Sequence, residues 1–129
     1  MMDAFGETRR IIELLRYRHA PPEWASFSEL STSTGAQMAR RLDFFAMSCW
    51  PSSGQHAIAY EVKVSRRDFA REIEDPSKRR HAEDVASECY FVTPHGLLKP
   101  DELPEGWGLI EAGAELRRVK VAAQRRVEA

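Results

Sequence analysis

The chain has 129 residues, 43% hydrophobic and 30% charged, so it can bury a core without disulfides or metals. Nineteen Lys and Arg residues against 20 Asp and Glu residues give a net charge of −1, which excludes a polycationic nucleic-acid coat and an acidic disordered tail protein. No apolar run approaches the roughly 18 residues of a membrane span, and no secretory leader opens the sequence. We therefore expect a cytoplasmic protein with no membrane partner.

Hydrophobic periodicity, together with the placement of proline and glycine, predicts alternating helices and strands. In chain order we expect a helix over 8–18, a short segment of uncertain type over 23–30, strands over 40–50 and 56–64, helices from Ser65 and over 76–88, strands over 89–93 and 107–111, and a strand or a helix over 115–122. Turn residues separate the two long strands, which predicts an antiparallel hairpin. Ser65 is a good N-cap, and Phe69 and Ile73 are expected to supply the buried contacts of its helix.

This order of elements indicates an α/β protein with a small mixed sheet flanked by helices. We expect a single domain over residues 1–129, with a core at about 8–112 and a C-terminal tail over 113–129. Cys49 and Cys89 are expected to be reduced and buried, since no export signal precedes them. Because zinc-finger spacing, a P-loop and a dinucleotide fingerprint are all missing from the sequence, no small-molecule cofactor is expected.

Three charged residues fall inside predicted strands, where charge is unexpected. Asp43 lies in the first strand of the hairpin, and Glu61 and Lys63 lie in the second. Because side chains alternate along a strand, Glu61 and Lys63 project from one face, roughly 7 Å apart. Asp43 comes to lie beside Glu61 if the two strands pair as predicted.

Two carboxylates and a lysine at one place are the parts needed for metal-assisted phosphodiester hydrolysis. Asp43 and Glu61 offer hard oxygen ligands to Mg²⁺, and the main-chain carbonyl of Val62 is a further candidate ligand. Lys63 could hold the attacking water or stabilise charge in the transition state. The alternative is a solvated strand face on which Glu61 and Lys63 form an ordinary ion pair.

Asp43 followed by Glu61-Val62-Lys63 resembles the signature of the PD-(D/E)XK nuclease superfamily. The stretch from Ile58 to Phe69 is similar to a small branch of it that is associated with DNA repair and with phages. The resemblance covers about residues 8–112 and implies a restriction-endonuclease-like αβββαβ core. It also implies Mg²⁺-dependent cleavage of DNA, with Asp43 and Glu61 as metal ligands and Lys63 as the catalytic lysine. Mn²⁺ is an alternative metal.

Two details of the family pattern stay open in this sequence. The proline that often precedes the aspartate is Leu42 here, which many members tolerate. Many members also carry an auxiliary glutamate on the first helix. Glu13 is the candidate by its position in a predicted helix, and Glu29 is the candidate by its place just before a loop.

Basic and polar residues that follow or flank the site are the candidate DNA contacts. They are Arg41, Ser65, Arg66, Arg67, Lys78 and Arg79. A helix N-terminus favours phosphate, and arginine clamps on the backbone would position a duplex without reading its sequence. The alternatives are that Ser65 only caps its helix and that the cluster around Lys78 is a solvated helix face.

The sequence therefore predicts a Mg²⁺-dependent DNA endonuclease, with DNA as its partner and a homodimer as an open possibility for cutting both strands. The main alternative is a catalytically inactive nuclease-fold module that binds DNA or protein. A structural phage or assembly protein that keeps only the fold is a third interpretation.

Overall fold

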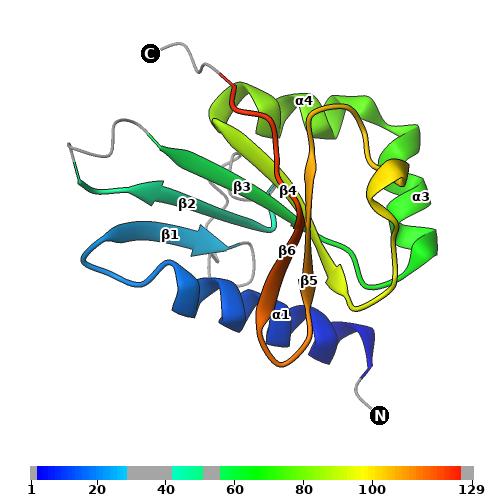
Figure 1. Cartoon of the computed structure of the whole chain (residues 1–129), viewed down its shortest axis with the longest axis horizontal. Helices are drawn as coiled ribbons and strands as arrows, with labels where there is room; N and C mark the ends of the chain where they lie inside the picture. Colours follow the sequence, from blue (N-terminus) through cyan, green and yellow to red (C-terminus); the bar gives the residue numbers. More distant parts are fainter. Residues whose placement is uncertain (1–2, 29–41, 51–55, 126–129) are drawn as a thin grey trace.

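The computed structural model describes residues 3–28, 42–50 and 56–125, with the side chain of Lys78 left out of the description (Figure 1). Its elements are α1 (Ala4–Arg18), β1 (Trp24–Ser28), β2 (Phe44–Ser48), β3 (Ala57–Val62), α3 (Arg66–Glu74), α4 (Pro76–Val85), β4 (Glu88–Pro94), the 3₁₀ turn η3 (Pro100–Glu102), β5 (Gly108–Ala112) and β6 (Leu116–Lys120). The predicted α/β class is confirmed.

All the strands belong to one six-stranded mixed sheet, in the order β1-β2-β3-β4-β5-β6. β2 runs antiparallel to both β1 and β3, which confirms the predicted hairpin of β2 and β3. The chain then crosses over through α3 and α4, so that β4 and β5 continue parallel to β3. β6 returns antiparallel along β5 and forms one edge of the sheet.

Helices cover both faces of the sheet, and alternate residues of each strand divide between two apolar clusters. One cluster lies under α1 and includes Ile11, Ile12, Leu15, Phe44, Ile58, Tyr60, Val62, Tyr90, Val92 and Ile110. The other lies under α3 and α4 and includes Phe45, Ala57, Ala59, Phe69, Ala82, Phe91, Trp107 and Leu109. Because the side-chain period of a strand is two, Glu61 faces the α3 and α4 layer with Ala57 and Ala59.

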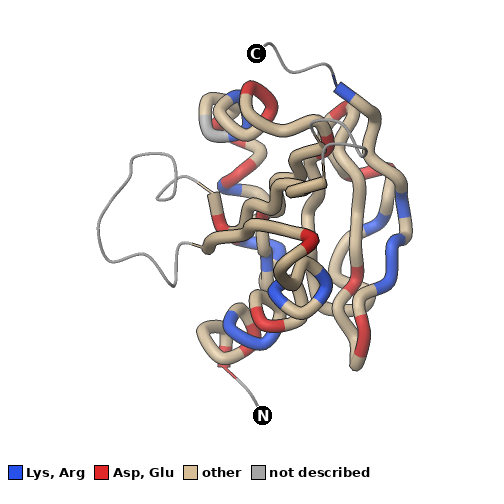
Figure 2. The backbone as a smooth tube through the Cα atoms, turned by 90° about the vertical axis from the view of Figure 1, so that its left-hand side faces the viewer, with Lys and Arg blue, Asp and Glu red and all other residues tan. Residues whose placement is uncertain are grey.

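Helix and strand ends differ from the sequence expectations for local reasons. α1 begins four residues earlier than predicted, because the carboxylate of Asp3 caps it by accepting from the Gly6 N–H at 2.7 Å. Acidic and basic side chains are interspersed along α1 (Figure 2). α4 ends at Val85 rather than near residue 88, since Glu88 already belongs to β4. The segment of uncertain type is a strand, β1.

The prediction of which α3 residues are buried was partly wrong. Phe69 is buried as predicted, but Ile73 is 37% exposed and the carboxylate-bearing Glu72 is buried in its place. Phe69 and Glu72 are three residues apart and therefore share the face of the helix that packs on the sheet. Lys63, described below, is the partner that makes a buried Glu72 tolerable.

The boundary expected at residue 112 also needs correction. β6 pairs with β5 from Leu116 to Lys120, and Ala122 beyond it is only 4% exposed within the cluster under α1. The sheet therefore extends into the segment that was predicted to be a tail. Of the two cysteines, both free, Cys89 is buried as expected but Cys49 is exposed. Within the described ranges, no helix combines the length and apolarity needed to cross a membrane.

The C-terminal end of α1 is held to the sheet by a buried histidine. His19 Nε2 lies 2.7 Å from the hydroxyl of Tyr60, and the imidazole contacts the ring of Trp24 edge-on, with ring centroids 4.3 Å apart. Burial, followed by the nearby charges of Arg18 and His56, lowers the pKa of His19 to about 4. His19 is therefore neutral at neutral pH in the folded chain.

Gly108 is predicted to tolerate no side chain. A Cβ at this position would lie 2.4 Å from Tyr90 Cε1 and 2.6 Å from the Lys120 carbonyl oxygen, so G108A should lower the free energy of unfolding by about 1–3 kcal/mol. G113A is the matched control, because a Cβ there meets nothing closer than 4.0 Å. Urea denaturation measures both, and equal stability of the two variants would contradict the close packing at Gly108.

Because His19 is neutral in the folded chain, the free energy of unfolding should depend on pH. The unfolded chain protonates this histidine near its ordinary pKa of about 6.5, whereas the folded chain does so only near 4. Stability is therefore lost as pH falls from about 6.5 to 4, by up to about 3 kcal/mol. Urea denaturation across that window should show the loss in the wild type and a smaller loss in H19Q. Identical slopes in the two proteins would contradict the assignment.

Candidate functional site

The β2–β3 register brings the two predicted carboxylates to one place. Phe44 pairs with Tyr60 in this antiparallel ladder, so Asp43, one residue earlier, stands opposite Glu61. Asp43 lies in a bend just before β2 rather than within the strand, and its Oδ2 accepts from the Val62 N–H at 2.7 Å. This hydrogen bond fixes the orientation of the Asp43 carboxylate and engages one of its two oxygens.

Lys63 follows β3 directly rather than lying within it. Its N–H donates to the Val92 carbonyl at 3.0 Å, which continues the β3–β4 pairing by one step. Its Nζ forms an ion pair with Glu72 Oε1 at 3.0 Å, across the gap between the sheet and α3. Lys63 therefore lies on the same face of the sheet as Glu61, as the sequence predicted.

These charged residues are buried. Glu61, Lys63 and Glu72 are 1%, 9% and 4% exposed, whereas Asp43 is half-buried. Desolvated charges are costly unless they are paired, so an acid–lysine–acid set inside an apolar layer is more typical of a functional site than of a stabilising feature. Among the described residues, no group of three or more His, Cys, Asp or Glu side chains is arranged to hold a metal.

A second polar row crosses the sheet one step further along the strands. Val62 pairs with Val92 and Thr93 pairs with Glu111, so Lys63, directly after β3, stands side by side with Thr93 of β4 and Glu111 of β5. Thr93 and Glu111 are buried on the same face as Phe91 and Leu109. Glu111 in turn contacts His95, which follows β4. The carboxyl ends of the three parallel strands thus present polar groups together.

The residues predicted at the start of α3 have defined intramolecular roles. Ser65 caps the helix by accepting from the Asp68 N–H at 3.1 Å, which is the simpler of its two expected roles. Arg66 donates to the Leu97 carbonyl at 2.9 Å and pairs with Glu102. That pairing lowers the pKa of Glu102 to about 2. Arg67 is exposed and lies on the first turn of the same helix.

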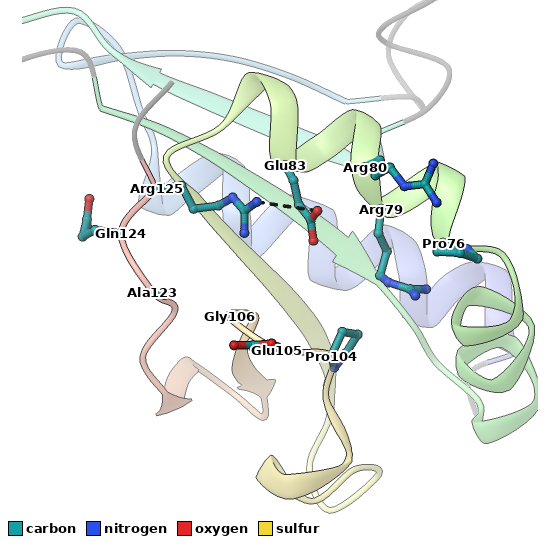
Figure 3. Close-up of a pocket in the computed structure, with 10 residues that line it drawn as sticks. All are labelled: Pro76, Arg79, Arg80, Glu83, Pro104, Glu105, Gly106, Ala123, Gln124 and Arg125. Carbon is teal, nitrogen blue, oxygen red and sulfur yellow. Dashed lines mark ion pairs between the residues drawn. The ribbon is translucent and has the colours of Figure 1, made fainter. Parts of the chain in front are cut away.

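The second basic cluster belongs to a different part of the surface. Lys78 lies on α4, and the guanidinium of Arg79 donates to the Glu72 carbonyl near the end of α3. Arg79 and Arg80 line a hollow of about 610 Å³. Figure 3 shows their side chains on α4, with the turn before β5 and the segment after β6 on the other side of the hollow. Neither the two carboxylates of the candidate site nor Lys63 lines this hollow.

The expected auxiliary acid is not brought to the site by α1. Glu13 is exposed, pairs with Arg16, and belongs to the helix that covers the opposite face of the sheet. The other candidate, Glu29, and the candidate DNA contact Arg41 both lie outside the described residues.

The sequence analysis did not predict four polar residues that lie near the site. They are Glu72, Thr93, His95 and Glu111. Glu72 had a usable signal, because it is three residues from the buried Phe69 and on the packed face of its helix. The others depend on the parallel register of β3, β4 and β5, which local periodicity does not specify.

Comparison with known proteins shows the fold alone. No protein-family model matches the chain, and no curated protein matches it either. Among solved structures, the SPO1766 protein of unknown function from Silicibacter pomeroyi is similar, with a TM-score of 0.63. The similarity covers 99% of this chain and 77% of that chain, and the two sequences are 17% identical.

The buried Lys63–Glu72 pair should show strong energetic coupling. Removing one partner leaves an uncompensated buried charge, so K63M and E72L should each lower the free energy of unfolding by about 3–5 kcal/mol. The double variant should lose much less than the sum of the two. Urea denaturation of the four proteins measures the coupling.

The exposed pair of Glu13 and Arg16 on α1 is the matched control, and E13Q with R16M should show a coupling near zero. Additive losses at Lys63 and Glu72 would contradict a desolvated pair at the candidate site.

Proposed function

We propose that the chain is a metal-dependent deoxyribonuclease of the PD-(D/E)XK superfamily, which hydrolyses phosphodiester bonds in DNA repair or phage DNA metabolism. The observation that carries the proposal is the strand register, because it places Asp43 opposite Glu61, with Lys63 on the same face. The order α1, β1, β2, β3, α3 with α4, and β4 is also in keeping with a restriction-endonuclease-like αβββαβ core.

The donor chemistry of the site fits Mg²⁺. This ion commonly uses one or two protein carboxylates and keeps several waters, and Asp43 and Glu61 would be those carboxylates, with the Val62 carbonyl as a further donor. The Val62 N–H engages Asp43 Oδ2, which orients the carboxylate while leaving Oδ1 for a cation. When bound, the ion would activate a water and neutralise charge on the phosphate oxygens. Mn²⁺ shares this preference for oxygen ligands and is expected to substitute for it.

The protein itself would position the reacting groups. Lys63 is held by Glu72 at the end of β3, where its ammonium could polarise the attacking water or stabilise negative charge on the phosphate. The first turn of α3 begins three residues later, so its N–H groups and the exposed Arg67 lie near the same place. DNA lying over the carboxyl ends of β3 and β4 would meet these groups together.

The Lys63–Glu72 pair favours one alternative function. A lysine already engaged by a buried carboxylate has less freedom to act on a water, so the same geometry suits a nuclease-fold module that binds DNA without cleaving it. Such a module is expected to bind DNA in a salt-sensitive manner. Its binding should survive the loss of Asp43.

Cleavage of supercoiled plasmid and of branched DNA with Mg²⁺ tests the proposal. The wild type should nick or cut at least one substrate, and EDTA should abolish the reaction. D43N and E61Q keep the side-chain shapes but weaken the metal ligands, so each should reduce the rate by at least about 100-fold, a loss of about 3 kcal/mol in transition-state stabilisation.

E13Q is the control, because Glu13 is an exposed acid on the opposite layer of the fold. It should cleave DNA at the wild-type rate. Failure of the wild type to cleave duplex, branched and single-stranded DNA, with salt-sensitive binding retained in D43N, would favour the binding module instead.

A further inference from the structure

A histidine–carboxylate pair lies at the same end of the sheet as the candidate site. Glu111 Oε1 is 3.0 Å from His95 Nδ1, and Glu111 Oε2 accepts from the Gly96 N–H at 3.0 Å. Both oxygens of the carboxylate are therefore engaged, and its side chain is only 11% exposed. The histidine side chain, in contrast, is 78% exposed.

This arrangement holds the imidazole in a defined orientation. Nδ1 faces a buried acceptor, so the other ring nitrogen, Nε2, is left for an external partner. In the imidazolium form, Nδ1 donates to Glu111 and Nε2 is a second N–H donor. The backbone beside the ring is held as well, because the Gly96 N–H donates to the same carboxylate. Gly96 has a φ of +77°, in the left-handed region that favours glycine.

The strand register relates this pair to Lys63. Lys63, directly after β3, stands side by side with Thr93 of β4 and Glu111 of β5, so Lys63 and Glu111 are separated by two strand spacings, about 10 Å. Successive phosphates on one strand of a DNA duplex rise about 3.4 Å along the helix axis and also rotate around it, so their separation in space is larger than this rise and about 10 Å covers only one or two phosphate steps. A phosphate at Lys63 therefore places a later phosphate of the same backbone within reach of His95.

Contacts within the protein join the His95 loop to the start of α3. Arg66 donates to the Leu97 carbonyl at 2.9 Å, and a hollow of about 500 Å³ beside Gly96 is lined by Arg66, Lys99, Asp101 and Glu102. The Glu102 carboxylate forms an ion pair with Arg66 and also accepts a hydrogen bond from the Lys99 N–H at 2.6 Å. Glu102 and Glu111 thus both have partners within the protein, whereas the His95 side chain is mostly exposed.

We propose that His95, oriented by Glu111, binds a backbone phosphate of DNA one or two positions along the same strand from the phosphate at the candidate site. The role is that of a positioning residue, since the contact fixes the path of the DNA strand and does not touch the reacting atoms. This inference rests on the proposed function for the identity of the ligand. It adds a phosphate contact, carried by the β4–β5 side of the sheet, that the sequence pattern did not indicate.

Binding of a fluorescein-labelled DNA duplex, measured by anisotropy in EDTA, tests the contact without cleavage. At about pH 6, H95Q should weaken binding roughly tenfold. The slope of log Kd against log salt should also fall by about 0.9, the value for one lost phosphate contact on duplex DNA. H95K keeps a cation at this position and should retain most of the slope.

H56Q is the matched control, because His56 also pairs with a strand carboxylate, that of Glu88, but at the opposite ends of β3 and β4. It should leave both the affinity and the slope unchanged. The proposal is overturned if the wild type binds no duplex, if H95Q leaves affinity and slope unchanged, or if H56Q lowers them equally. Loss of Mg²⁺-dependent cleavage in H95Q with unaltered DNA affinity also overturns it, since His95 would then act in the chemistry.

The two proposals fail separately. Plasmid cleavage by the wild type with no binding effect of H95Q would retain the nuclease and remove the phosphate contact. A reduced salt slope in H95Q, in a protein that never cleaves DNA, would retain the contact and remove the nuclease.

Discussion

Strand β3 is buried along its whole length between two layers of helix, and the other features of the site depend on that burial. It pairs with β2 on one side and β4 on the other, while α1 lies over one face and α3 with α4 over the opposite face. A charged residue in such a strand has no route to bulk water, so each one requires a partner from a neighbouring element. Lys63 meets this requirement through Glu72, and Asp43 is oriented by the Val62 N–H.

The burial also explains why the helices stand where they do. α3 begins at the Ser65 cap, two residues after Lys63, and runs back over the face that Glu61 occupies. Its apolar anchor is Phe69 and its polar anchor is Glu72, so one helix face closes the apolar layer and neutralises the lysine. Arg79 of α4 then donates to the Glu72 carbonyl, which connects the second helix to the end of the first. The crossover is therefore built around the site as well as joining β3 to β4.

The elements that carry the site were predictable because their signals are local. Alternating apolar residues and an intervening turn predict the β2–β3 hairpin, and a serine N-cap predicts the start of α3. The opposed positions of Asp43 and Glu61 follow from the hairpin alone. The pairing of β4 with β5 joins segments that are well separated along the chain, such as Tyr90 and Gly108, and for that reason Glu111 and His95 were not foreseen. The hydrophobicity of Ile73 predicts that it is buried, but Glu72 is buried in its place. Glu72 occupies the packed face of α3 because it pairs with the buried Lys63, and this pairing is not visible in the local pattern of the helix.

The β6 edge of the sheet affects how another protein chain could pair with this one. β6 forms one edge, and an exposed edge strand can template pairing with a second molecule. Within its five residues, β6 carries Arg117, Arg118 and Lys120. A second copy that added its own β6 there would bring like charges together across the new ladder, which opposes the growth of a continuous intermolecular sheet. The cationic edge thus acts against self-association by strand addition.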